Sequence, residues 1–105
     1  MAFMKETTIY QNKDTRVYIN QCYNKGKKTN LYAVRSDNKR AYGELIGIIK
    51  FDGGWRQYVL FPEPNTKWSA GCKEAISKFE REITNKWRNK LRRKKWLRNL
   101  EKNQL

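Results

Sequence analysis

The feature that most constrains the fold of this chain is a helical repeat of apolar residues in its C-terminal third. Ser69 is a favourable N-cap residue, and the repeat begins directly after it. Apolar side chains then recur at spacings of three and four, which places them on one stripe of an α-helix: Cys72, Ala75, Ile76, Phe79, Ile83, Trp87 and Leu91. The sequence therefore predicts one helix over residues 69–100.

This predicted helix is longer than the body that precedes it. From Ala70 to Leu100 it would extend on the order of 45 Å at 1.5 Å per residue. A globule of about 70 residues has a radius of gyration of only about 11 Å. The distal half must therefore protrude, turn back after a break, pack against another chain, or stay mobile until it meets a partner.

Residues 7–62 have the pattern of an antiparallel sheet, because aromatic and β-branched residues form short runs between turn residues. The predicted strands are Thr7–Gln11, Arg16–Tyr23, Thr29–Arg35, Glu44–Phe51 and Trp55–Phe61. The predicted turns are Asn24–Lys28, Ser36–Arg40 and Asp52–Gly54. We expect an α+β fold in a single domain over residues 1–105, with a meander of three to five antiparallel strands and one long C-terminal helix as the second layer.

Within the last strand, we expect Trp55, Val59 and Phe61 to share one face. Pro62 and Pro64 end the strand, since proline cannot donate to the ladder. The helix is expected to begin against that face.

Positive charge is concentrated at one end of the chain. The sequence has 24 Lys plus Arg against 10 Asp plus Glu, a formal charge of +14, and residues 86–105 contribute +8 of it. The eight cations of the basic run are Lys86, Arg88, Lys90, Arg92, Arg93, Lys94, Lys95 and Arg98. On a helix they lie nearly all round the cylinder, and the phosphates of DNA or RNA would relieve their mutual repulsion. About six neutralised phosphates would give a slope of log affinity against log salt of roughly −5 on duplex DNA.

Two tryptophans interleave with these cations and have different expected roles. Trp87 completes the apolar stripe and is expected in the core. Trp96 lies off the stripe, and its ring is expected to stack on an unpaired base or on Arg.

A second basic group lies in the sheet half of the chain. Its members are Lys25, Lys27 and Lys28 in the first turn, then Arg35, Lys39 and Arg40. Lysines at hairpin tips often only protect sheet edges. If these tips lie on the same side as the helix end, they would instead form one positive groove with it.

The composition argues against catalysis. The chain has no histidine, which removes Ser–His and Cys–His nucleophile pairs and the commonest zinc ligand. We predict no enzymatic activity, no metal and no cofactor. The alternative is a pair of carboxylates, brought together from distant strands, that holds Mg²⁺.

Cys22 and Cys72 could form one bridge, but with no export signal we expect reduced, partly buried thiols. No apolar run approaches the roughly 18 residues that span a bilayer, so we expect a cytoplasmic protein.

The central quarter of the chain carries a distinctive pattern. Its clearest part is W-R-Q-Y-x-x-F-P-x-P-x-T over residues 55–66, preceded by Gly47–Phe51 and followed by Trp68–Cys72. This pattern resembles one found in a family of small bacteriophage and prophage proteins. The resemblance implies a phage or mobile-element origin and a bacterial host cytoplasm, and it assigns no site residues.

Three functions are compatible with these features. The first is non-enzymatic binding of DNA or RNA through the basic helix, aided by the hairpin lysines. The second is inhibition of a host protein, ribonucleoprotein or defence complex by protein–protein contact, as an anti-CRISPR-like protein would act. The third, a basic amphipathic helix on a membrane surface, is disfavoured because apolar residues and charge are poorly separated, so we expect no membrane partner. Two copies could also pair through the protruding helix.

Overall fold

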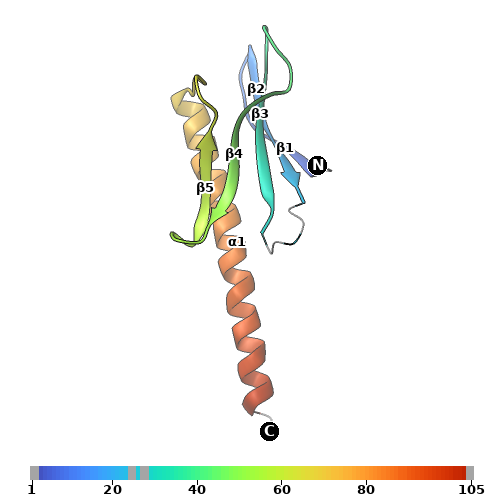
Figure 1. Cartoon of the computed structure of the whole chain (residues 1–105), viewed down its shortest axis with the longest axis vertical. Helices are drawn as coiled ribbons and strands as arrows, with labels where there is room; N and C mark the ends of the chain where they lie inside the picture. Colours follow the sequence, from blue (N-terminus) through green and yellow to red (C-terminus); the bar gives the residue numbers. More distant parts are fainter. Residues whose placement is uncertain (1–2, 24–25, 27–28, 104–105) are drawn as a thin grey trace.

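The computed structural model describes residues 3–23, 26 and 29–103. In that part of the chain, five strands form one antiparallel sheet and one long helix follows them (Figure 1). The elements are β1 (Phe3–Gln11), β2 (Thr15–Cys22), β3 (Leu31–Asn38), β4 (Glu44–Asp52), β5 (Gln57–Pro62) and α1 (Ala70–Asn103). The strands lie in the order β1-β2-β3-β4-β5, which is a meander, so the predicted α+β class is confirmed.

The first strand begins four residues earlier than the sequence predicted. It starts at Phe3 instead of Thr7, because β2 extends to Cys22 and provides partners for the extra residues. Phe3 pairs with Cys22, and Lys5 pairs with Gln21. Pairing with a neighbouring strand therefore overrides the polar character of this segment.

The predicted turn at Ser36–Arg40 is wrong for its first three residues. Ser36 to Asn38 belong to β3, because Asp37 pairs with Arg16 across the ladder to β2. The turn itself follows Asn38, whose Oδ1 accepts hydrogen bonds from the backbone N–H groups of Arg40, at 2.8 Å, and of Ala41, at 3.0 Å. Turn-forming residue types are thus held in a strand by their partners on β2.

The turn between β4 and β5 is also longer than predicted. Asp52 Oδ1 accepts hydrogen bonds from the backbone N–H groups of Gly54 and Trp55, at 2.8 and 3.1 Å. Residues 53–56 form the turn, and β5 begins at Gln57. Trp55 is consequently 70% exposed and does not belong to the strand.

The face of β5 that meets the helix is the opposite of the predicted one. Tyr58 is buried and Leu60 packs against the core, whereas Phe61 is 42% exposed. The ammonium group of Lys50 lies 4.5 Å from the centre of the Phe61 ring, on the face turned away from the helix. Residues 58–61 are all apolar, so their pattern could not decide which alternate residues face inward.

The start of the helix and its apolar stripe are as predicted. Ser69 Oγ accepts a hydrogen bond of 3.2 Å from the backbone N–H of Cys72, which is the N-cap geometry. Cys72, Ile76 and Ile83 are buried, with Phe79 and Trp87 packed beside them. Both cysteines are buried and free, in agreement with the expectation of reduced thiols.

The helix packs against one face of the sheet and contacts both edge strands, β1 and β5 (Figure 1). Its side chains also cap the open edge of β5. The backbone N–H of Tyr58 donates to Thr84 Oγ1 at 3.0 Å, and that of Leu60 donates to Glu80 Oε2 at 3.1 Å. The edge strand is therefore bonded on both sides, which anchors the proximal half of α1.

Beyond Leu91 the helix leaves the sheet as a continuous α-helix (Figure 1). Residues 92–101 are all exposed. The molecule measures 63 × 27 × 23 Å with a radius of gyration of 16.8 Å, against about 13 Å for a compact chain of this length. Of the four arrangements open to the distal half, the structure adopts the protruding one.

Candidate nucleic-acid interface

The eight predicted cations of the basic run all lie on α1 and are all exposed. The ion pairs of the described residues involve other groups: Arg16 with Glu6 and Asp37, and Lys39 with Asp14. Among those residues, no carboxylate lies within 4.0 Å of a cation of the basic run. The positive charge at this end of the protein therefore faces solvent.

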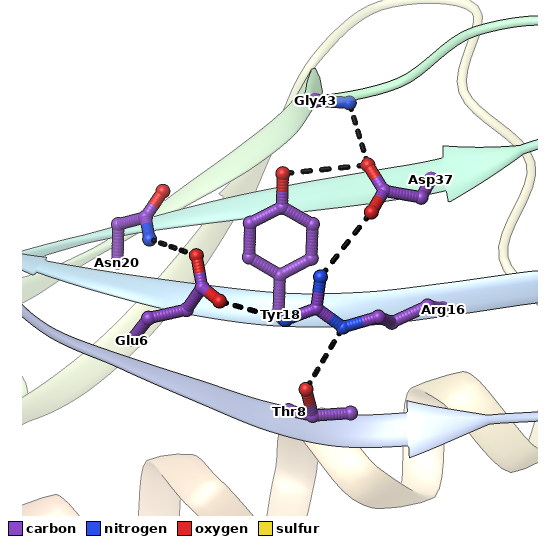
Figure 2. Close-up of polar contacts among 7 residues, drawn as sticks. All are labelled: Glu6, Thr8, Arg16, Tyr18, Asn20, Asp37 and Gly43. Atoms are coloured by element: carbon purple, nitrogen blue, oxygen red, sulfur yellow. Dashed lines mark hydrogen bonds and ion pairs between the residues drawn. The ribbon is translucent and has the colours of Figure 1, made fainter.

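Two acidic residues of the sheet, Glu6 and Asp37, pair with Arg16. On β2, Arg16, Tyr18 and Asn20 alternate with core residues and so project from the face that the helix does not cover. Figure 2 shows how the carboxylates gather around Arg16, whose guanidinium lies 2.7 Å from Glu6 Oε2 and 3.2 Å from Asp37 Oδ2.

Further bonds fix this network. Asp37 Oδ1 accepts the backbone N–H of Gly43 at 2.7 Å and the Tyr18 hydroxyl at 3.4 Å. The hydrogen bond that Arg16 donates to Glu6, with smaller contributions from Asp37, raises the pKa of Arg16. These two carboxylates are therefore committed to the outer face of the sheet and do not neutralise the helix.

The two tryptophans of the basic run have separate environments. Trp87 packs its ring at 4.5 Å from that of Phe51, with the Arg56 guanidinium 5.9 Å from its centre. Trp96 is 61% exposed and lies next to Leu97, which is 47% exposed. Trp87 belongs to the core as predicted, and Trp96 is open to a partner.

Only part of the second basic group can be placed. The predicted Lys25, Lys27 and Lys28 lie outside the described residues. Gln21 at the end of β2 and Asn30 just before β3 line a cavity together with residues of the basic run, so this end of the sheet adjoins the basic run.

The remaining cations of that group do not join the interface. Lys39 Nζ lies 3.2 Å from Asp14, and Arg35 donates a 2.9 Å hydrogen bond to the carbonyl oxygen of Gly43. Arg40 lines a different cavity beside Ser69, at the start of the helix. The predicted continuous groove therefore excludes Arg35, Lys39 and Arg40, because the β3–β4 turn lies at the opposite end of the sheet from the basic run.

The cavity beside the distal helix has a volume of about 260 Å³, and we name it the root cavity. Three lysines line it: Lys5 from β1, and Lys86 and Lys90 from α1. No Asp or Glu of the described residues is among its lining. The root cavity therefore adjoins the basic run, and both are positively charged.

The walls of the root cavity are aromatic. Tyr32 stands edge-on to Tyr58 and to Phe79, with ring centres 5.6 and 5.4 Å apart, and Trp87 completes the wall. Burial raises the pKa of Tyr32, and it raises the pKa of Tyr58 to about 12. Both phenols therefore stay protonated at neutral pH and remain neutral hydrogen-bond donors.

Sequence reasoning missed the sheet residues of this cavity. Lys5, Gln21 and Tyr32 lie side by side because each pairs with the next across the β1–β2–β3 ladder. The one available signal was Gln21, a polar residue two positions from Ile19 on a face that is otherwise apolar.

The comparisons with known proteins add no assignment: no family model matches the chain, and searches of curated proteins and of solved structures find no match. Within residues 3–23, 26 and 29–103, no three His, Cys, Asp or Glu side chains are grouped as a metal site would require. In the same part of the chain, no helix combines the length and the apolar character needed to cross a lipid bilayer.

Proposed function

We propose that this protein binds nucleic acid without catalysis, through the phosphate backbone, using the exposed cations of the basic run, five of which lie on the protruding part of α1. The observation that carries the proposal is that eight Lys and Arg residues surround a helix that extends beyond the sheet and lack carboxylate partners within the described residues. The cations on this helix repel one another, and an external polyanion would reduce that repulsion.

The chemistry of the contact follows from the residue types. Lys and Arg side chains on an α-helix neutralise phosphates and release condensed counterions, which makes the affinity depend steeply on salt. Such contacts position a protein on nucleic acid but carry little sequence information. We therefore expect weak sequence specificity, with Trp96 available to stack on an exposed base.

The test is a titration of a labelled DNA hairpin, followed by fluorescence anisotropy at a series of salt concentrations. About six phosphate contacts give a slope of log affinity against log salt of roughly −5. A slope near zero, or no binding at low salt, rejects the proposal.

A second candidate function is inhibition of a host protein or defence complex, and the exposed apolar residues of the distal helix favour it. Trp96, Leu97 and Leu100 are 61%, 47% and 38% exposed, and buried aromatic anchors dominate many protein interfaces. This candidate requires one saturable acidic partner whose binding survives nuclease treatment and is lost in Trp96→Ala. The nucleic-acid proposal requires the opposite result with nuclease.

The resemblance of residues 55–66 to small phage proteins supports a further part of the proposal, that the protein acts in the cytoplasm of a bacterial host. Both candidate functions fit that setting, because host DNA, host RNA and defence complexes share it.

A further inference from the structure

We propose that the root cavity receives one unpaired base of a single-stranded nucleic acid, while the adjoining phosphates lie on Lys5, Lys86 and Lys90. The inference rests on the proposed function and deepens it, because it selects single strands over duplexes as the preferred ligand.

The size and walls of the cavity suit a planar aromatic group. Its volume of about 260 Å³ is slightly below the roughly 300 Å³ at which pockets for drug-sized ligands begin, which is room for one ring system. Tyr32, Tyr58 and Trp87 form its sides, and contacts with Phe51 and Phe79 hold these rings in place. Tyr32 and Tyr58 are 8% and 6% exposed, so the ring that can stack on the face of a base is that of the partly exposed Trp87.

Polar groups in the same cavity match the edge of a base. Gln21 provides an amide donor and acceptor, and Thr7 provides a hydroxyl. The Watson–Crick edge of a base is free to meet such groups only when the base is unpaired. This requirement is what directs the ligand toward single strands.

Charge and position extend the site along the helix. Three lysines and no carboxylate of the described residues line the cavity, so a phosphate next to the inserted base meets only positive charge. Lys86 and Lys90 belong also to the basic run, which leads from the cavity to Arg98, about 12 Å beyond Lys90 along the axis at 1.5 Å per residue. The larger cavity at the helix start includes Glu44 in its lining and lacks this match.

The experiment compares two single strands of equal charge by fluorescence anisotropy at one fixed salt concentration. One is an oligothymidylate of about twelve nucleotides, and the other has the same sugar–phosphate chain without bases. Wild-type protein is expected to bind the abasic strand about tenfold more weakly, since base–aromatic stacking accounts for a difference of this size. Equal binding of the two strands overturns the inference, and this readout needs no variant.

Two variants locate the base. Gln21→Trp fills the cavity without changing charge and is expected to abolish the difference between the two strands. Tyr42→Ala removes an exposed ring from the β3–β4 turn, at the opposite end of the sheet, and is expected to preserve it. Retention of the difference in Gln21→Trp, or its loss in Tyr42→Ala, overturns the inference.

The failure of the proposed function gives a different result. If neither single strand nor a duplex binds at low salt, the basic helix is not a nucleic-acid site, and both the proposed function and this inference are rejected. If all three bind with a steep salt dependence but without base preference, only the root cavity is rejected.

Discussion

Neutralising four cations of the protruding helix is expected to halve the salt dependence of nucleic-acid binding. The variant carries Arg92→Gln, Arg93→Gln, Lys94→Gln and Lys95→Gln. All four side chains are exposed and lie beyond the last residue that packs against the sheet, so the fold is expected to be unaffected.

The magnitude follows from the helix geometry. Successive residues are rotated by about 100°, so the eight cations divide between two halves of the cylinder. One half holds Arg88, Arg92, Lys95 and Arg98, and the other holds Lys86, Lys90, Arg93 and Lys94. A duplex along either side contacts about four cations, which gives a slope of log affinity against log salt of about −3.6. Long side chains that reach round from the other half make the slope steeper, toward about −5.

The variant removes two cations from each half of the helix surface. Whichever half contacts the duplex, the slope of log affinity against log salt is therefore reduced to about −1.8. Raising the salt fourfold would then weaken binding about 12-fold, compared with about 150-fold for wild type at a slope of about −3.6 and about 1,000-fold at a slope of about −5.

The assay is anisotropy of a labelled duplex over that salt range, with circular dichroism to verify the fold. A matched control has four exposed cations replaced by Gln in the segment that precedes and packs along the sheet: Lys67, Lys73, Lys78 and Arg81. It loses the same net charge. An unchanged slope in the distal variant, or an equal reduction in the control, would refute the assignment of binding to the protruding helix.

Three further predictions concern the body of the protein. Thr84→Val leaves the buried N–H of Tyr58 without an acceptor and should lower the free energy of unfolding by about 1–3 kcal/mol in urea titrations, while Thr84→Ser, which keeps the hydroxyl, should lower it less. Burial raises the pKa of Glu80 above 4.5, so the folded state binds the extra proton and stability falls as pH rises from 4.5 through the raised pKa. Glu80→Gln keeps an acceptor for Leu60 and should remove that fall; an unchanged pH profile of unfolding would contradict this account. Burial also raises the pKa of Cys72, so a thiol reagent should label it only at the rate of unfolding, and rapid labelling of native protein would contradict the packing.

The sequence allowed the helix to be predicted well, because its signals are local. The cap at Ser69, the stripe from Cys72 to Leu91 and the excess of length over the sheet are all fixed by neighbouring residues and simple dimensions. The face of β5 was predicted wrongly because Tyr58 to Phe61 are all apolar, and only pairing with β4 decides which of them point inward.

Part of the candidate site could also be predicted from the sequence, and part could not. The exposure of the basic run followed from charge at every angle of one helix. The root cavity could not be predicted, because it needs the register that sets Lys5 beside Gln21 and Gln21 beside Tyr32, together with the place where α1 crosses them. Long-range pairing of this kind leaves almost no trace in the order of residues along the chain.

The capping of β5 by the helix has a consequence for biogenesis. Glu80 lies 20 residues after Leu60, and Thr84 lies 26 residues after Tyr58, so a ribosome completes the strand well before it synthesises the groups that protect it. During that interval the edge can recruit a strand from another nascent chain, and aggregation competes with folding until the helix docks. A binding partner that pulled the proximal helix away would reopen the same edge, so any ligand must leave the contacts of Glu80 and Thr84 with β5 in place.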